Sequence, residues 1–134
     1  MFTAETKVRV RYGETDKMGY AYYGYYTLYY EVARTDAMRT LGMTYKELEA
    51  MGIMLPVSEV NIKYIKPAFY DDELLIKTFI KKLPGLRIVF DYEIYNPDNE
   101  LINTGQSTLV FINQKENKPC KPPDKFIKKI KTYF

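Results

Sequence analysis

The sequence predicts an α+β domain in which an antiparallel five-stranded sheet wraps around one long helix. Apolar and polar residues alternate with the period of a strand in five segments, and a segment between the first two has the period of a helix. Turn residues connect the later strand segments directly, which favours antiparallel pairing. At 134 residues the chain fits one domain, so residues 1–134 are expected to form a single unit without linkers or repeats.

The first strand and the long helix flank a polar turn. Residues 5–12 alternate between two kinds of side chain, as in a strand with one buried face, and Gly13 begins a loop. Over residues 24–41, apolar and aromatic residues recur at steps of three and four, which predicts a helix that buries one broad stripe. Gly42 stands where a left-handed residue commonly ends a helix. The stripe comprises Tyr25, Leu28, Tyr29, Val32, Ala33, Ala37 and Leu41.

A short helix, four strands and a terminal helix are expected in the rest of the chain. Thr44 and Glu47 have the spacing of a capping box before a helix over residues 45–51, and Gly52 ends it. Pro and Gly or Asn separate the alternating segments that follow, and three prolines then precede a basic helix. The predicted strands are residues 57–65, 74–83, 87–95 and 101–113, and the terminal helix is residues 124–133.

The composition excludes several kinds of catalysis. The chain has no histidine, which removes Ser-His-Asp and Cys-His mechanisms and histidine-ligated zinc. The single Cys120 can form no internal disulfide, and it is expected to be an incidental loop thiol. No metal site is therefore expected. Any acid–base chemistry falls to Asp, Glu, Tyr or Lys side chains.

Positive charge is concentrated in the last twenty residues. Residues 115–134 hold seven Lys against Glu116 and Asp124, a net charge of +5, and the whole chain carries +3. Such a tail raises the possibility of nucleic-acid binding, but it lacks an aromatic or Gly-rich RNA-binding signature, so a solvated helix is favoured and no nucleic-acid partner is expected. No apolar run approaches the roughly 20 residues that span a bilayer, and no signal-peptide pattern is present, so a cytoplasmic protein without a membrane span is expected.

The motif D-x-x-G-x-x-Y-Y-x-x-Y, followed by E-V-A-R, resembles the opening of the 4-hydroxybenzoyl-CoA thioesterase family, the acyl-CoA thioesterases of hotdog fold. The likeness continues through residues 64–67, 70–74 and 105–113 and so covers nearly the whole chain. It implies hydrolysis of a thioester to a carboxylic acid and free coenzyme A, with no cofactor, since coenzyme A is part of the substrate. The matching residues are Asp16, Gly19, Tyr22, Tyr23, Tyr26, Glu31, Ala33 and Arg34.

The resemblance gives two residues a catalytic role. Considered alone, Asp16 is a turn residue that hydrogen-bonds to its own backbone. The family places its catalytic aspartate at this position, as a nucleophile or as a base that activates water, and the sequence leaves both roles open. At Tyr23 the family uses the backbone amide at the helix start to polarise the thioester carbonyl. The residues expected to bind the substrate around them are Gly19, Tyr22, Gly24 and Tyr26.

Each of the other charged candidates has two alternative assignments. Glu31 is a second carboxylate, and another subgroup of hotdog enzymes uses a helix glutamate for catalysis, but an ion pair with Arg34 at three-residue spacing is favoured. Lys66, Lys82 and Arg87 are expected to bind the phosphates of coenzyme A, with a solvated face as the alternative. The basic tail would also suit these phosphates.

The expected partners are an acyl-CoA or acyl carrier protein thioester and a second copy of the chain. One face of the sheet has to bury apolar surface against another subunit, which predicts a homodimer or homotetramer. Residues 22–26 and 57–65 are then expected to form the acyl pocket from opposite subunits. The alternative function is a non-catalytic hotdog protein that binds acyl-CoA or acyl carrier protein, and Asp16 argues against it.

Overall fold

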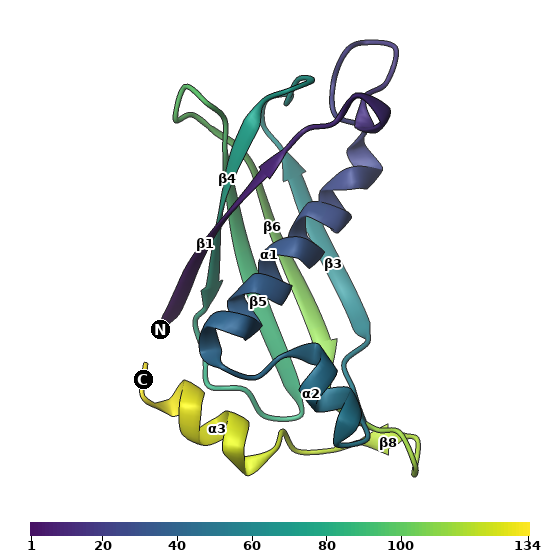
Figure 1. Cartoon of the computed structure of the whole chain (residues 1–134), viewed down its shortest axis with the longest axis vertical. Helices are drawn as coiled ribbons and strands as arrows, with labels where there is room; N and C mark the ends of the chain where they lie inside the picture. Colours follow the sequence, from purple (N-terminus) through teal and green to yellow (C-terminus); the bar gives the residue numbers. More distant parts are fainter.

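A computed structural model describes all 134 residues, Met1–Phe134. One long helix lies across a face of a five-stranded sheet with the strand order β1-β4-β5-β6-β3 (Figure 1). Every neighbouring pair in this sheet is antiparallel. The predicted α+β hotdog architecture with five strands is therefore confirmed. The strands are β1 (Phe2–Arg9), β3 (Val57–Tyr64), β4 (Glu73–Ile80), β5 (Arg87–Tyr95) and β6 (Leu101–Val110).

The helices begin and end close to the predicted residues, because local signals set their ends. Gly42 has φ 85° and ends the long helix by donating its N–H to Arg39 O. Thr44 caps the second helix by accepting the Glu47 N–H at 3.1 Å. A 3-10 turn, η2 (Tyr23–Tyr25), precedes the long helix, so the α-helix starts two residues after the predicted Gly24. The α-helices are α1 (Tyr26–Leu41), α2 (Tyr45–Ala50) and α3 (Asp124–Lys131).

Three strand predictions are wrong at their ends. β1 stops at Arg9 because the chain turns into a 3-10 segment, η1 (Tyr12–Glu14), and Val10 N bonds to Asp72 O. β4 stops at Ile80, and the last predicted strand divides at Phe111, whose N–H bonds to Leu86 O. The residues after Phe111 join a small second sheet that the sequence did not predict. It consists of β2 (Ile53–Met54), β7 (Ile112–Asn113) and β8 (Lys118–Pro119).

The buried stripe of α1 is rotated from the predicted one. Leu28 and Val32 remain 49% and 45% exposed, whereas Tyr30 and Met38 are fully buried. Tyr30 stacks on Tyr92 with ring centroids 4.2 Å apart, and its hydroxyl donates to Asn103 Oδ1. A Cβ atom at Gly105 would overlap the Tyr30 ring and hydroxyl, so the missing side chain makes the hollow in β6 that accepts this tyrosine.

One edge of the sheet stays uncovered. α1 packs over β1 and β4, and β3 is the edge strand at the other side. No residue of β3 is buried, and Val57 and Val60 are 43% and 38% exposed. An edge strand with exposed apolar side chains is prone to pair with another chain.

α3 covers the end of the molecule that lies farthest from the turn before α1 (Figure 1). Phe126 and Ile130 are buried, Lys129 Nζ donates to Gly42 O at the end of α1, and Tyr133 packs on Phe2 of β1. None of the helices is both long and apolar enough to span a bilayer.

Candidate active site

The loop between β1 and α1 is closed by backbone hydrogen bonds. Tyr22 N donates to Glu14 O at 2.7 Å, and Asp16 N donates to Tyr20 O at 2.9 Å. Gly19 N donates to Asp16 O at 3.0 Å, and Gly19 has φ 79°, a conformation that glycine adopts without strain. The loop is therefore a compact turn that presents Asp16 beside the start of the helix. Gly19 shapes the turn and does not line the pocket described below.

The Asp16 carboxylate is anchored through one oxygen only. Oδ1 accepts the backbone N–H groups of Met18 at 2.9 Å and Tyr20 at 3.2 Å, while Oδ2 accepts no hydrogen bond within the chain. The side chain is half-buried. The turn role and a reactive role are thus compatible, because the oxygen that stabilises the turn leaves the other one free.

Asp16 is one of the residues that line an apolar pocket of about 280 Å³. Of the residues predicted for the site, the pocket unites Asp16, Tyr23, Tyr26 and Lys66. Its walls are mostly aromatic and aliphatic, which suits an acyl group. The full lining is Asp16, Met18, Tyr20, Ala21, Tyr23, Tyr26, Tyr64, Ile65, Lys66 and Pro67.

Tyr64, at the end of β3, was missed as an individual site residue. Its hydroxyl donates to Tyr23 O at 2.9 Å, and its ring lies 5.2 Å from that of Tyr26. The helix entrance and the strand after Pro56 therefore meet within one chain. The expectation that these two segments form the acyl pocket from opposite subunits is wrong for this pocket, because both of them line it within a single chain. The sequence carried one signal for Tyr64: the period-two alternation of residues 57–65 places it on the same face as Val60 and Ile62.

The helix start supplies free backbone donors. Tyr25 N bonds to Tyr22 O and Tyr26 N bonds to Tyr23 O, but the N–H groups of Tyr23 and Gly24 have no acceptor within the chain. These donors also lie at the positive end of the α1 dipole, which favours a developing negative charge. Tyr22 and Gly24 do not line the pocket: the Tyr22 ring lies where a Cβ at Gly24 would be, so both shape the helix entrance.

The residues predicted to bind coenzyme A are divided between the two ends of the sheet. Lys66 lines the pocket, but its ammonium is paired with Glu100, and this contact together with Asn96 lowers the pKa of the Glu100 carboxyl. In the β1–β4 pair, Glu73 lies opposite Arg9 at the end beside the Asp16 loop, and Ile80 lies opposite Phe2 at the other end. Lys82 and Arg87 lie at this second end, where β4 stops and β5 begins. β4 alone separates these ends by about 23 Å.

The basic tail is also distant from Asp16. α3 contacts the C-terminal end of α1, whereas the Asp16 loop lies at its N-terminal end (Figure 1). A helix of sixteen residues is about 24 Å long. One chain alone therefore brings neither the tail, nor Lys82, nor Arg87 to the pocket.

Glu31 and Arg34 do not form the expected ion pair. Arg34 Nε donates to Tyr45 Oη at 3.2 Å, and no carboxylate lies within ion-pair distance of its guanidinium. Glu31 is exposed and belongs with Arg34 to a separate cavity of about 240 Å³ between α1 and β3. It does not share the pocket of Asp16.

Known proteins are similar to this chain in architecture and in sequence. The family model described as the thioesterase-like superfamily matches residues 10–130. The acyl-CoA thioester hydrolase YbgC of Escherichia coli is 32% identical over 124 residues, which cover 92% of this chain and 92% of that protein. The solved structure of a DHNA-CoA thioesterase from Staphylococcus aureus is 40% identical, matches 90% of this chain and 81% of its own, and has a TM-score of 0.86. A 1,4-dihydroxy-2-naphthoyl-CoA thioesterase from Synechocystis matches 96% of both chains with a TM-score of 0.88, and at 23% identity it supports the fold alone.

The family match includes the Asp16 loop, α1 and four of the five strands of the main sheet. The resemblance seen in the D-x-x-G-x-x-Y-Y motif is therefore confirmed. The chain is a thioester hydrolase of hotdog fold and belongs to the thioesterase-like superfamily.

Proposed function

We propose that the protein hydrolyses acyl-CoA thioesters, with Asp16 as the reactive carboxylate and the Tyr23 N–H as the donor to the thioester carbonyl. The observation that carries this proposal is the pairing of two unused groups at one apolar pocket: the free Oδ2 of Asp16 and the free N–H at the helix start. The names of the similar E. coli and S. aureus proteins, an acyl-CoA thioester hydrolase and a DHNA-CoA thioesterase, support the same substrate class.

Two routes lead to the same products. In the first, Asp16 takes a proton from water as the water oxygen attacks the carbonyl carbon, and the oxyanion accepts the Tyr23 N–H. The intermediate then collapses, the C–S bond breaks, and coenzyme A leaves as a thiolate that takes up the proton. In the second, Asp16 attacks and forms a mixed anhydride, the thiolate leaves, and water cleaves the anhydride to release the acid and restore Asp16.

The lining of the pocket supports entry of the acyl part of the substrate. The side chains of Tyr26, Tyr64 and Ile65 suit an acyl group, which would leave the thioester beside Asp16. One lost oxyanion donor typically costs a factor of about 10² to 10³ in kcat, so the helix-start amide accounts for a substantial part of the expected rate.

A substrate panel tests this function directly. Short, long and aromatic acyl-CoAs and an acyl carrier protein thioester are compared by release of free thiol, with purified wild-type protein. Hydrolysis of at least one acyl-CoA is expected at a rate far above the spontaneous one. Release from the carrier protein alone would contradict coenzyme A as the carrier, and no release from any substrate would overturn the proposal.

We also propose that the active unit is a homodimer formed at β3. The uncovered side of the molecule carries Leu28 and Val32 on α1 and Val57 and Val60 on β3, and the unpaired backbone of the edge strand lies beside them. A two-fold axis at this edge pairs β3 with its copy in antiparallel orientation.

This pairing gives the distant basic residues a place at the site. Tyr64 marks the end of β3 beside Asp16, and Val57 marks the end beside β5 and Arg87, since Val57 pairs with Leu109 and Leu109 with Ile88. In an antiparallel pair the Val57 end of one copy adjoins the Tyr64 end of the other. Lys82 and Arg87 of one chain are then directed toward the pocket of its partner, where they can bind the phosphates of coenzyme A.

A further inference from the structure

We propose that Glu14, a buried carboxylate outside the pocket, is the positioning residue that holds the Asp16 turn in register with the start of α1. This inference rests on the proposed role of Asp16. Glu14 is the only buried residue among the Asp, Glu, Lys and Arg side chains, with 6% of its surface exposed. It ends η1 two residues before Asp16 and does not line the pocket, so it acts through other residues.

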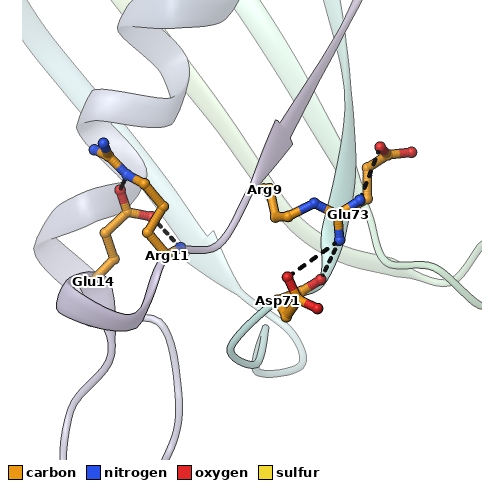
Figure 2. A network of polar contacts seen from close by, with 5 residues as sticks. All are labelled: Arg9, Arg11, Glu14, Asp71 and Glu73. Atoms are coloured by element: carbon orange, nitrogen blue, oxygen red, sulfur yellow. Dashed lines mark hydrogen bonds and ion pairs between the residues drawn. The ribbon is translucent and has the colours of Figure 1, made fainter.

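The side chain of Glu14 joins the segment just after β1 to α1. Oε1 accepts the Arg11 backbone N–H at 3.0 Å and the Tyr29 hydroxyl at 2.9 Å. Oε2 accepts Arg11 Nε at 2.8 Å (Figure 2). Both carboxylate oxygens are therefore satisfied, and one of the contacts reaches the first full turn of α1. Burial by itself raises the pKa of the Glu14 carboxyl, but the hydrogen bonds from Arg11 and Tyr29 outweigh it, so the pKa is lowered and the group is charged at neutral pH.

The backbone of the same residue closes the loop that carries Asp16. Glu14 O accepts the Tyr22 N–H at 2.7 Å, on the far side of the loop, and Glu14 N donates to Arg11 O at 3.0 Å. One residue thus fixes both ends of the Asp16 loop and ties them to the helix whose first amides are the proposed oxyanion donors. Asp16 and the Tyr23 N–H have to act on one carbonyl group, so their separation depends on these contacts.

A second ion-pair network nearby has no such connection. Arg9 bonds to Asp71 O at 2.6 Å and to Glu73 Oε2 at 3.3 Å (Figure 2). It joins β1 to the start of β4 on the exposed surface, and Glu73 is about half exposed. It reaches neither α1 nor the Asp16 loop, and it provides a matched control for the loss of an Arg–Glu contact.

A charge buried at Glu14 is a costly way to gain stability. Desolvation of a carboxylate offsets much of the gain from its hydrogen bonds, and well-packed apolar residues often replace buried ion pairs without loss of stability. Its directional contacts define positions, however, and a misplacement of about 1 Å in a reacting group can cost about 10²-fold in rate. The arrangement therefore favours a role in geometry.

The test compares Glu14→Gln, Tyr29→Phe and the control Glu73→Gln, each in wild-type and Asp16→Asn backgrounds. Glu14→Gln is expected to lower kcat by about 10-fold to 10²-fold while KM changes little, because binding groups stay in place and the reacting groups are misaligned. Tyr29→Phe removes one contact and should lower kcat by a smaller factor. Glu73→Gln should leave kcat and KM unchanged.

The Asp16→Asn background separates positioning from general damage. Glu14→Gln should lower the melting temperature equally in both backgrounds but reduce the rate only where Asp16 is present. An unchanged kcat in both Glu14→Gln and Tyr29→Phe, or an equal fractional loss of the residual rate in the Asp16→Asn background, overturns the inference. If Glu14→Gln does not fold, Tyr29→Phe is the test: its kcat, and its fractional loss of the residual rate in the Asp16→Asn background, then decide whether the inference stands. Full turnover by Asp16→Asn itself would instead overturn the proposed function.

Discussion

At the scale of single residues, two carboxylates near the pocket differ in how many of their oxygens accept hydrogen bonds. Asp16 uses one oxygen to hold its own turn and keeps the other free, whereas Glu14 has both oxygens occupied and is buried. The first arrangement leaves a group that can react, and the second leaves a group that can only fix positions. Both carboxylates belong to one three-residue segment, Glu14 to Asp16, and the sequence motif singled out Asp16 but assigned no role to Glu14.

Asp16→Asn is expected to remove most of the thioester hydrolysis, to leave a small residual rate, and to leave the fold intact. The Asn Oδ1 can still accept the N–H groups of Met18 and Tyr20, so stability should change by no more than about 0.5 kcal/mol. The loss of the charged oxygen should lower kcat by about 10² to 10⁴-fold. Thiol-release kinetics and thermal unfolding measure both effects, and Asp36→Asn, an exposed carboxylate on α1 paired with Arg39, is the control. Wild-type turnover in Asp16→Asn would move the reactive group elsewhere.

Glu14 should also contribute to the pH dependence of stability. Its folded pKa is lowered from the ordinary value of 4.5, so its contribution is present above about pH 4.5 and is lost as the pH falls through the folded pKa. The free energy of unfolding of wild type should therefore fall more steeply below pH 4.5 than that of Glu14→Gln. Urea unfolding at pH 7, 5, 4 and 3 measures the difference between the two proteins. A difference that is constant across this range would show that Glu14 does not titrate with unfolding.

At the scale of elements, the sequence predicted what depends on local chemistry. Gly42 and Thr44 act as caps through contacts within a few residues, so their signals are complete in the sequence. The rotation of the α1 stripe depends instead on Gly105, which is seventy-five residues from the Tyr30 that it accommodates. The break at Phe111 likewise depends on a bond to Leu86. Helix periodicity alone cannot supply such contacts.

In the candidate site, too, the sequence predicted the local features and missed the contacts between residues that are distant in the sequence. The motif places Asp16 and Tyr23 a few residues apart, and the structure unites them at one pocket. Tyr64 reaches Tyr23 from forty-one residues away, and the Glu14 contact to Tyr29 spans fifteen. A glutamate in a polar loop ordinarily indicates an exposed side chain, so its burial could be found only from the structure.

Gly105→Ala should destabilise the protein through α1. The added methyl group overlaps the Tyr30 ring and hydroxyl, which are fixed by stacking on Tyr92 and by Asn103. Forced repacking of a filled core typically costs about 1–3 kcal/mol. Gly85→Ala, at a position with no atom within 4 Å of the added Cβ, is the control and should change stability by about 0.5 kcal/mol or less. Urea unfolding measures both, and equal effects would contradict the close approach of Tyr30.

At the scale of the whole molecule, one chain leaves both its surface and its site incomplete. Leu28, Val32, Val57 and Val60 expose apolar side chains around an unpaired edge strand, and the basic residues expected at the site lie at the far end of the sheet. A second copy across β3 resolves both features with one symmetry operation. The proposed dimer would therefore serve function as well as stability.

Sedimentation should report at least a dimer for the wild-type protein in dilute solution. Val60→Lys puts a charge into the proposed interface and should yield a monomer with little hydrolytic activity. Val60 is 38% exposed in one chain, so the effect would arise at the interface and not in the core of the chain. Phe134→Lys, a similarly exposed residue after α3 at the opposite edge of the sheet, should remain dimeric and active. Unfolding of the wild type should also depend on protein concentration. A stable, active wild-type monomer would exclude the shared site.

Mixing two impaired variants tests whether Arg87 acts on the pocket of its partner. Asp16→Asn lacks the reactive carboxylate, and Arg87→Ala is expected to bind coenzyme A weakly and so to raise KM. In a heterodimer of the two, one pocket combines the Asp16 of the Arg87→Ala chain with the Arg87 of the Asp16→Asn chain. If Arg87 acts across the interface, co-refolding equal amounts should restore about a quarter of the wild-type sites, because half of the dimers are mixed and each mixed dimer has one intact pocket.

If Arg87 acts within its own chain, no mixed dimer contains an intact site and the activity at low substrate should stay at the mean of the two variants. Thiol release before and after co-refolding distinguishes these outcomes, and a mixture of two Asp16→Asn preparations gives the background.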